Sequence, residues 1–401
     1  MTAPRLEIRL DRIGHNARSL VDRLRARGVS VTAVTKATLG LPQVATVLAA
    51  AGVSGIGEPR LETIAALRRA GVSLPLTLIR SPMPSQVQQV VAQADISLNT
   101  EPAVLAMLSA AAIAQNHRHG VILMVELGDL REGILPERLE GIAAGLLGLP
   151  GLDLIGLGAN LACQNGVVPS ETSMAQLSGL ATALEASFGI VLPLVSGGNS
   201  ANLPWLLDGG TVGRINNLRL GEAILLGREP LQRRPIQGLC TRAFRLVAEV
   251  IESNRKPTLP WGDCQQGAFG SPPARVDRGD RWRVLLALGL QDVDAAGLTL
   301  PRGMTLLGAS SDHLVLDTGS VAVPVGTELV FDLNYSALLR AMTSPFVART
   351  LVGTMSGRSG RGCRVQAGQV ALALPRRPGL IETDPSGEKP DRLGHSGRSR
   401  D

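Results

Sequence analysis

The sequence predicts an α/β fold in which an N-terminal (β/α)8 TIM-type barrel is followed by a C-terminal all-β domain. Residues 30–225 alternate short apolar runs with longer amphipathic ones, the pattern of a parallel sheet. Eight such runs suit a closed barrel. A doubly wound open sheet is the alternative, but no G-x-G-x-x-G motif follows an early run. After about residue 235, short apolar runs broken by Gly, Pro, Asp and Ser replace the alternation.

The expected elements follow in order along the chain. Residues 6–10 resemble a strand, and residues 11–28 resemble a helix with Asp11 as its N-cap. Amphipathic helical patterns such as 41–52 separate the barrel strands. These strands are expected at SVTAVTK (30–36), VSGIGE (53–58), LPLTLIR (74–80), DISLN (95–99), GVILMVEL (120–127), LDLIGLGAN (152–160), VLPLVSGGN (191–199) and GRINNLRLG (213–221).

Domain boundaries follow from the change in pattern. We expect the barrel over residues 1–235 and the β domain over residues 236–354, with one helix near SALLRAM (336–342). Residues 355–401 are poor in aliphatic side chains and rich in Gly, Arg, Ser and Pro, which predicts a disordered tail. Within that tail, only VALAL (370–374) has the composition to pack.

Composition and charge exclude several classes of protein. The net charge is 40 − 34 = +6, and +4 of it lies in residues 355–401, so the folded part is close to neutral. With aromatic residues at only 2%, this argues against nucleic-acid binding. No run is long and apolar enough for a membrane span, and the N-terminus does not resemble a signal peptide. Four dispersed cysteines without a C-x-x-C pair argue against a metal site and disulfides, and fit the cytoplasm.

One lysine stands out because lysines are rare in this chain. Only Lys36, Lys256 and Lys389 occur among 40 basic residues. A genome rich in arginine codons explains the bias, yet arginine cannot replace a lysine that reacts through its amine. Lys36 ends the first barrel strand, where active sites of such barrels lie. It is either an amine that forms an imine with an aldehyde or a lysine that extends from a strand end into water.

A glycine-rich turn after the seventh strand provides the second signal. SGGNSAN (196–202) opens a short helix, where converging backbone N–H groups and the hydroxyl of Ser200 can bind phosphate. The alternative is an ordinary capped turn. With Lys36 at the same barrel mouth, the pair suggests an aldehyde that carries a phosphate, pyridoxal 5′-phosphate (PLP). Arg219 ends the eighth strand beside this turn.

Several motifs together resemble the alanine racemase superfamily of fold-type-III PLP enzymes, most closely its alanine/ornithine racemase branch. The resemblance covers about residues 3–350, is strongest in the barrel, and extends to SSDHLVLD (310–317). The motifs that carry it are VTK (34–36), VELGDLREGI (125–134), ANLACQNGV (159–167), VSGGNSANL (195–203) and NNLRLGEAILLGRE (216–229).

The resemblance implies a role for each matching residue. Lys36 would hold PLP covalently and move the Cα proton on one face of the substrate. Arg219 would face the pyridine nitrogen and keep it unprotonated, which makes the ring a weaker electron sink. The remaining implied contacts are Ser200, Gly198 and Gly221 to the phosphate, Arg131 to the phenolic oxygen, and Asn160 where the family places a histidine against the ring.

One family feature is missing. Alanine racemases use a tyrosine in a G-Y-x-D-like stretch of the partner subunit as the opposite base, and Gly289-Leu290-Gln291-Asp292 stands at that stretch here. The second proton carrier therefore stays open. His313, with its ordinary pKa near neutrality, and Asp312 are the preferred catalytic candidates. The others are Asp292 and Tyr335, although for Tyr335 a place in the core or an interface is favoured.

Three further residues have two interpretations each. Glu58 and Arg80 face the barrel mouth, where they either close a strand end or contact the substrate's carboxylate or side chain. Cys163 follows the sixth barrel strand and could line the pocket, but we favour a buried structural cysteine.

The sequence thus predicts a cytoplasmic PLP-dependent amino-acid racemase that forms a head-to-tail homodimer. Two other functions remain. A non-catalytic PLP-binding homeostasis protein shares the barrel, but such proteins lack the β domain. A fold-type-III amino-acid decarboxylase would release carbon dioxide.

Overall fold

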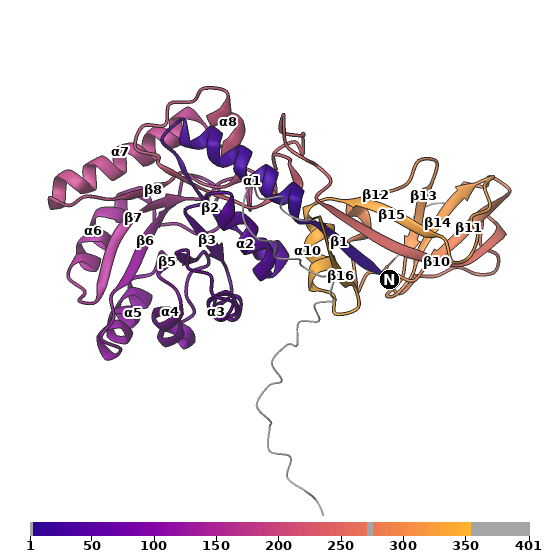
Figure 1. Ribbon diagram of the computed structural model, residues 1–401, viewed down its shortest axis with the longest axis horizontal. Helices are drawn as coiled ribbons and strands as arrows, with labels where there is room; N and C mark the ends of the chain where they lie inside the picture. Colours follow the sequence, from indigo (N-terminus) through magenta and orange to yellow (C-terminus); the bar gives the residue numbers. More distant parts are fainter. Residues whose placement is uncertain (1–2, 271–275, 354–401) are drawn as a thin grey trace, which may run out of the picture. The chain divides into compact units, whose positions relative to one another are not determined.

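In the computed structural model, which describes residues 3–270 and 276–353, the predicted barrel is confirmed. Its parallel strands are paired in chain order and the last strand closes onto the first, with Arg219 opposite Thr32. Figure 1 labels several of these strands, from β2 to β8, with helices around them. The strands are β2 (Ser30–Val34), β3 (Gly55–Glu58), β4 (Leu76–Leu78), β5 (Ile96–Asn99), β6 (His119–Val125), β7 (Leu152–Ala159), β8 (Leu194–Ser196) and β9 (Asn217–Leu220).

Helices cover the barrel because each connection between parallel strands must cross back along the sheet. Their buried faces pack with the strands into apolar clusters that include Ile56, Leu123 and Val195, all fully buried. The helices are α2 (Pro42–Ala50), α3 (Leu61–Arg69), α4 (Val87–Gln93), α5 (Pro102–Ala114), α6 (Pro136–Leu147), α7 (Glu171–Phe188), α8 (Leu203–Leu207) and α9 (Glu222–Leu226). The 3-10 turns η1 (Lys36–Thr38), η2 (Pro84–Gln86) and η3 (Ser200–Asn202) lie in three of the loops.

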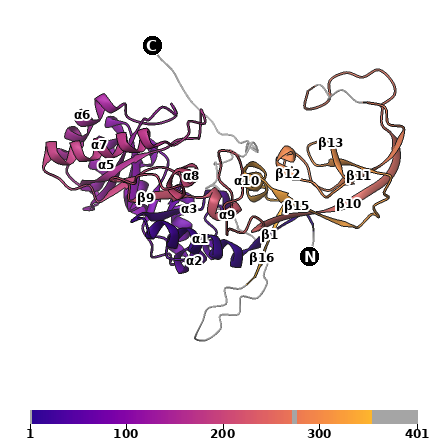
Figure 2. The ribbon, with the colours of Figure 1, turned by 90° about the horizontal axis from the view of Figure 1, so that it is seen from above.

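The later part of the chain forms a separate sheet, as the sequence predicts. Its main path runs β12-β15-β10-β11-β14-β13 with antiparallel pairing. Figure 2 shows these strands apart from the barrel strands. The elements are β10 (Phe244–Pro257), β11 (Asp280–Leu286), η4 (Ala295–Gly297), β12 (Leu298–Thr299), β13 (Thr305–Ala309), β14 (Leu314–Gly319), β15 (Glu328–Leu333), α10 (Tyr335–Thr343) and β16 (Ala348–Val352).

The first strand does not belong to the barrel. β1 (Arg5–Arg9) pairs with β10 and β16, so the start of the chain contributes to the second sheet. Leu6 and Ile8 are fully buried there, whereas their sequence neighbours are less covered. The boundary at residue 235 remains a prediction.

Helix α1 (Leu10–Arg25) starts one residue earlier than expected. Arg9 occupies the N-cap position without a side-chain cap, so Asp11 is not the N-cap. Asp11 instead lies in the first turn, where its charge suits the helix dipole, and pairs with Arg9 at 2.9 Å.

Two further predictions concern the C-terminal tail and membrane-spanning helices. The expected disordered tail, including VALAL (370–374), lies beyond the described residues. Among the residues that are described, no helix is both long and apolar enough to cross a bilayer.

Candidate active site

A pocket of about 680 Å³ opens at the carboxyl ends of the barrel strands. Small-molecule sites occupy roughly 300–1,000 Å³, so this volume suits a cofactor together with an amino acid. The residues that line it are Val34, Lys36, Pro59, Ile79, Arg80, Ser81, Leu98, Arg131, Glu132, Asn160, Ala162, Cys163, Asn199, Ser200, Arg219, Gly221, Glu222, Pro230, Arg233 and Tyr335.

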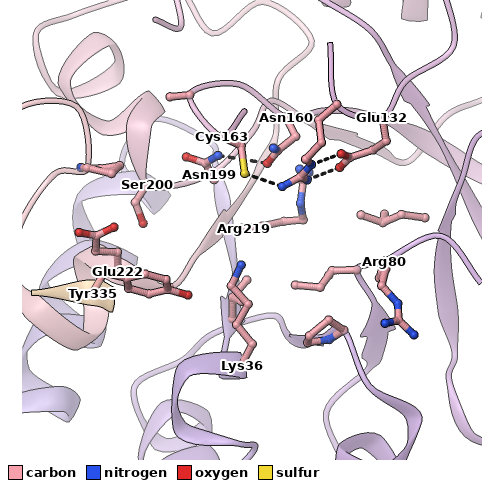
Figure 3. Close-up of a pocket in the computed structure, with 18 of the residues that line it drawn as sticks. Lys36, Arg80, Glu132, Asn160, Cys163, Asn199, Ser200, Arg219, Glu222 and Tyr335 are labelled. Carbon is pink, nitrogen blue, oxygen red and sulfur yellow. Dashed lines mark hydrogen bonds and ion pairs between the residues drawn. The ribbon is translucent and has the colours of Figure 1, made fainter. Parts of the chain in front are cut away.

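Lys36 enters this pocket from the loop after β2. The strand is buried on both faces, and the chain turns at η1 immediately afterwards, so the long side chain projects from a fixed base. Figure 3 shows its amine directed into the pocket below Arg219. The amine nitrogen lies 5.9 Å from the ring centre of Tyr335, which begins α10. Helix α10 of the second domain therefore reaches the same pocket.

The turn after β8 builds a narrow polar corner. Asn199 caps η3 by accepting the N–H of Ala201 at 2.8 Å, and Ser200 Oγ accepts the N–H of Ala223 at 3.2 Å. A Cβ on Gly198, whose φ is +147°, would lie 2.1 Å from Asn202 Oδ1. A Cβ on Gly221 would lie 3.2 Å from the Val34 carbonyl oxygen. Only glycine at these two positions leaves the corner open. The hydroxyl of Ser200 and the backbone N–H groups of the turn fit an anion such as a phosphate.

Arg219 forms the inner wall of the pocket. Its side chain projects from β9 and is only 6% exposed. One terminal nitrogen donates to Ser196 Oγ at 2.6 Å and the other to the Ala159 carbonyl at 2.7 Å. Burial lowers the pKa of Arg219 to about 10, with nearby Arg131 acting in the same direction. The guanidinium therefore remains charged at neutral pH, in a fixed orientation.

Asn160 carries an unpaired buried donor. Its Oδ1 accepts from Asn199 Nδ2 at 3.1 Å, whereas its own Nδ2 is buried and has no hydrogen-bond partner among the described residues. Leaving such a donor unpaired costs roughly 1–3 kcal/mol, so a native site usually supplies a partner. The residues at this wall thus fit a polar ligand.

The opposite rim is held by a buried carboxylate. Asp129, only 1% exposed, accepts backbone N–H groups of Cys163 and Gln164, the latter at 2.8 Å, and also of residues 165 and 167. Burial alone would raise the pKa of Asp129, but these hydrogen bonds outweigh it and lower the pKa. The carboxylate ties the loop after β6 to the loop after β7, and so places Arg131 beside Cys163.

Arg131 is engaged on both sides. Its guanidinium donates to both carboxylate oxygens of Glu132 and to Cys163 Sγ. This pairing raises the pKa of Arg131, against the effect of burial. Glu132 is half-buried at the rim, and so a carboxylate, a cation and a thiol meet at one edge of the pocket.

Glu58 is a buried acid beside Lys36. It ends β3, is 1% exposed, and accepts the hydroxyl hydrogen of Thr35. Burial raises the pKa of Glu58 to about 8, against the lowering effects of Thr35 and of the Lys36 charge. Glu58 is thus largely protonated at neutral pH, behind the pocket rather than on its lining.

Replacing Glu58 with glutamine tests this raised pKa. Between pH 4.5 and about 8 the unfolded chain loses the Glu58 proton while the folded chain keeps it, so folding stability falls as pH rises. A shift of this size corresponds to about 3–5 kcal/mol. Glutamine retains an oxygen for Thr35 but cannot ionise. We expect Glu58→Gln to flatten the decline in unfolding midpoint from pH 5 to 8, and parallel curves for the two proteins would contradict this.

The structure brings most of the predicted site residues together. Six of the seven predicted cofactor contacts line the pocket, and Gly198 lies just beneath it, where its carbonyl accepts the Arg219 N–H at 2.9 Å. His313 and Asp312 are not among the lining residues. They lie in the second domain, where Asp312 is exposed, His313 is partly buried, and the His313 ring nitrogen pairs with Asp312 at 2.8 Å.

One interpretation of the sequence needs correction. Cys163 is exposed and lines the pocket, so it is not a buried structural cysteine. Tyr335 packs against the core, as favoured, and it also lines the pocket beside Lys36. Sequence reasoning missed Glu132, Glu222 and Arg233 altogether. Glu132 directly follows Arg131 and Glu222 directly follows Gly221, so their position next to predicted site residues was the available signal.

Comparison with known proteins gives a consistent result. Residues 8–229 match the family described as alanine racemase, N-terminal domain. A lysine racemase of Thermotoga maritima is 38% identical over 87% of this chain and 98% of its own length. An ornithine racemase of Acetoanaerobium sticklandii is 34% identical over 87% of this chain and 99% of its own length. The crystal structure of an alanine racemase from Streptomyces lavendulae, 20% identical, covers 88% of this chain and 99% of its own with a TM-score of 0.69.

Proposed function

The chain belongs to the alanine racemase family, and we propose that it is a PLP-dependent racemase whose substrates are basic amino acids of the lysine and ornithine type. The observation that carries this proposal is the convergence of the Lys36 amine, the Ser200 corner and the Arg219 guanidinium on one pocket. The relatives named lysine and ornithine racemase support the substrate class.

Each residue of the pocket would have a separate role in racemisation. PLP, when bound, withdraws electrons from the Cα of an amino acid joined to it and so makes the Cα proton removable. Lys36 would hold the cofactor covalently and, once released by the substrate's amine, move the Cα proton on one face. Ser200 and the Gly221 N–H would bind the phosphate. Arg131 would contact the phenolic oxygen, and Asn160 Nδ2 would donate at the ring.

Arg219 would set the reaction type. A guanidinium does not give up its proton to a pyridine nitrogen, so that nitrogen stays unprotonated and the ring remains a moderate electron sink. Moderate withdrawal shortens the time for which the negative charge at Cα persists, and so suppresses transamination. Proton transfer then depends on well-placed acid and base groups.

The substrate would lie at the end of the pocket away from the phosphate corner. In Figure 3, Ser200, Glu222 and Tyr335 lie on one side, and Arg80 and Glu132 lie on the other. The Arg80 guanidinium lines the pocket and forms no hydrogen bond or ion pair with another described residue. We assign it the α-carboxylate of the substrate, and we assign Glu132 the distal ammonium group of a basic side chain.

A second copy of the chain would complete the site. The expected partner is a homodimer mate whose β domain covers the open rim of the pocket, with both copies in the cytoplasm, where the free thiols of Cys163, Cys240 and Cys264 stay reduced. Analytical ultracentrifugation of the PLP-loaded protein tests the dimer.

A racemisation assay tests the proposed function. L-lysine, L-ornithine and L-alanine are incubated separately with the PLP-loaded protein, and circular dichroism follows the loss of optical activity. We expect lysine and ornithine to racemise with the highest kcat/KM. Carbon dioxide release would instead indicate a decarboxylase, and unchanged optical activity with all amino acids would indicate a PLP-binding protein without catalysis.

Replacing Arg80 with alanine should raise the KM for lysine and ornithine by about 10–100-fold, because a charge-assisted hydrogen bond contributes roughly 1.5–3 kcal/mol. The value of kcat should change much less. Arg60→Ala is the matched control, since Arg60 is exposed at the start of α3 and does not line the pocket. Equal KM values for Arg80→Ala and the unaltered enzyme would rule out this carboxylate contact.

A further inference from the structure

Inversion at Cα needs a proton carrier on each face of the substrate, and the chain lacks the tyrosine expected at position 290. The pocket itself offers a limited choice among the described residues. Apart from arginines, whose protons stay bound, the lining groups that can exchange a proton are the side chains of Lys36, Glu132, Cys163, Glu222 and Tyr335, together with the weakly acidic hydroxyls of Ser81 and Ser200.

Three of these groups are poorly placed for the second role. Tyr335 lies against Lys36, on the same side of the pocket, and burial raises the pKa of its hydroxyl further above its usual value. Glu222 pairs with Arg233 at the phosphate end. Glu132 shares both carboxylate oxygens with Arg131 and, in the proposed function, binds the distal ammonium group of the substrate. Each of these three groups therefore lies on the side of Lys36, lies at the phosphate end, or is committed to binding the substrate.

Cys163 enters the pocket from the side opposite Lys36. It follows β7, whereas Lys36 follows β2, and β8 and β9 separate these two strands on the shorter way around the barrel. Figure 3 shows the Lys36 amine entering the pocket from one side and the Cys163 sulfur from the opposite side. The thiol is exposed to the pocket rather than packed in the core.

The surroundings of Cys163 hold the thiol in place and put a cation beside it. The Arg131 guanidinium lies within hydrogen-bond distance of the sulfur, so a thiolate there faces a fixed cation. The backbone N–H of Cys163 is held at 3.1 Å by the buried Asp129 carboxylate, which limits movement of the loop. The unpaired Asn160 Nδ2 on the loop from the same strand points independently to a ligand bound at this wall.

We propose that Cys163 is the second acid–base group of the racemase, opposite Lys36. This inference rests on the proposed function. In one direction the Lys36 amine takes the proton from Cα, and the Cys163 thiol gives its proton to the other face. The thiolate is then paired with Arg131, and Lys36 carries the extra proton. In the reverse direction the thiolate takes the proton and Lys36 returns one. Exchange with water restores both groups between turnovers.

Proton exchange in heavy water separates this role from a structural one. The PLP-loaded Cys163→Ala enzyme and the unaltered enzyme are incubated with each enantiomer of lysine in D2O. Optical activity reports racemisation, and mass spectrometry reports deuterium at Cα. Removal of a proton carrier typically costs 10²–10⁴-fold, so we expect Cys163→Ala to racemise lysine at least about 100-fold more slowly. It should still exchange the Cα proton of one enantiomer with retention, because Lys36 remains.

Controls fix the interpretation. Cys240→Ser removes a thiol outside the pocket and should leave racemisation within about 2-fold, and an unchanged visible absorption band shows that the cofactor is bound. Racemisation by Cys163→Ala within about 3-fold of the unaltered enzyme would overturn the proposal, as would loss of exchange with both enantiomers while the cofactor is bound. If His313→Asn racemised lysine about 100-fold more slowly while Cys163→Ala stayed active, the second proton carrier would instead lie in the β domain of the partner copy. Failure of the unaltered enzyme to racemise any amino acid would reject the proposed function itself.

Discussion

Lys36→Ala is expected to abolish racemisation, by at least about 10⁴-fold, because the amine has two roles that no other described residue of the pocket can fill. It would bond to the cofactor, and it would move the Cα proton on its own face. The purified PLP-loaded protein should also lose the visible absorption band of a lysine–cofactor linkage. Borohydride, which reduces such a linkage to a stable bond, should label the unaltered protein and leave Lys36→Ala unlabelled.

Two substitutions serve as controls for this experiment. Lys36→Arg keeps a cation of similar length but cannot form the covalent bond, so it should be as inactive as Lys36→Ala. Lys256→Ala removes a partly buried lysine outside the pocket that pairs with Glu252 on β10, and should retain both the band and the activity. A band that persists in Lys36→Ala would show that another amine holds the cofactor. The proposed chemistry at the first strand end would then fail.

The sequence predicted the barrel well because its strands are buried on both faces and therefore appear as continuous apolar runs. Residues at the ends of those runs, such as Lys36 and Arg219, necessarily meet at one mouth once the barrel closes. The same logic placed Ser200 and Gly221 at that mouth. Their geometry follows from topology alone, while their roles toward the cofactor stay predictions.

Other parts of the site depend on loops and on the second domain, which strand periodicity does not address. The orientation of Cys163 follows from Asp129, which holds the loop after β7 through four backbone N–H groups that no sequence pattern reveals. Tyr335 reaches Lys36 only because α10 packs against η1, a contact across about 300 positions of the chain. The first strand joined the second sheet for a similar reason, since alternation in LEIRL does not specify its partner.

Arg219→Glu is expected to change the outcome of the reaction as well as its rate. A carboxyl group in the place of the guanidinium would hydrogen-bond the ring nitrogen in its protonated form, and so strengthen electron withdrawal. The negative charge at Cα would persist for longer, and proton return would then occur at the cofactor as well as at Cα. We expect racemisation to fall on the order of 10²–10³-fold, with 2-oxo acid appearing as a transamination product.

Arg219→Gln provides the matched comparison, because it also removes the guanidinium but supplies no acidic group to the ring nitrogen. Both variants lose the charge-assisted hydrogen bonds to Ser196 and Ala159, and each should be destabilised by about 2–4 kcal/mol. Both should therefore lower the unfolding temperature, but only Arg219→Glu should produce 2-oxo acid, measured by coupled reduction with NADH. Equal 2-oxo acid formation by the two variants would mean that Arg219 acts through packing, since the protonation of the ring nitrogen is what distinguishes them.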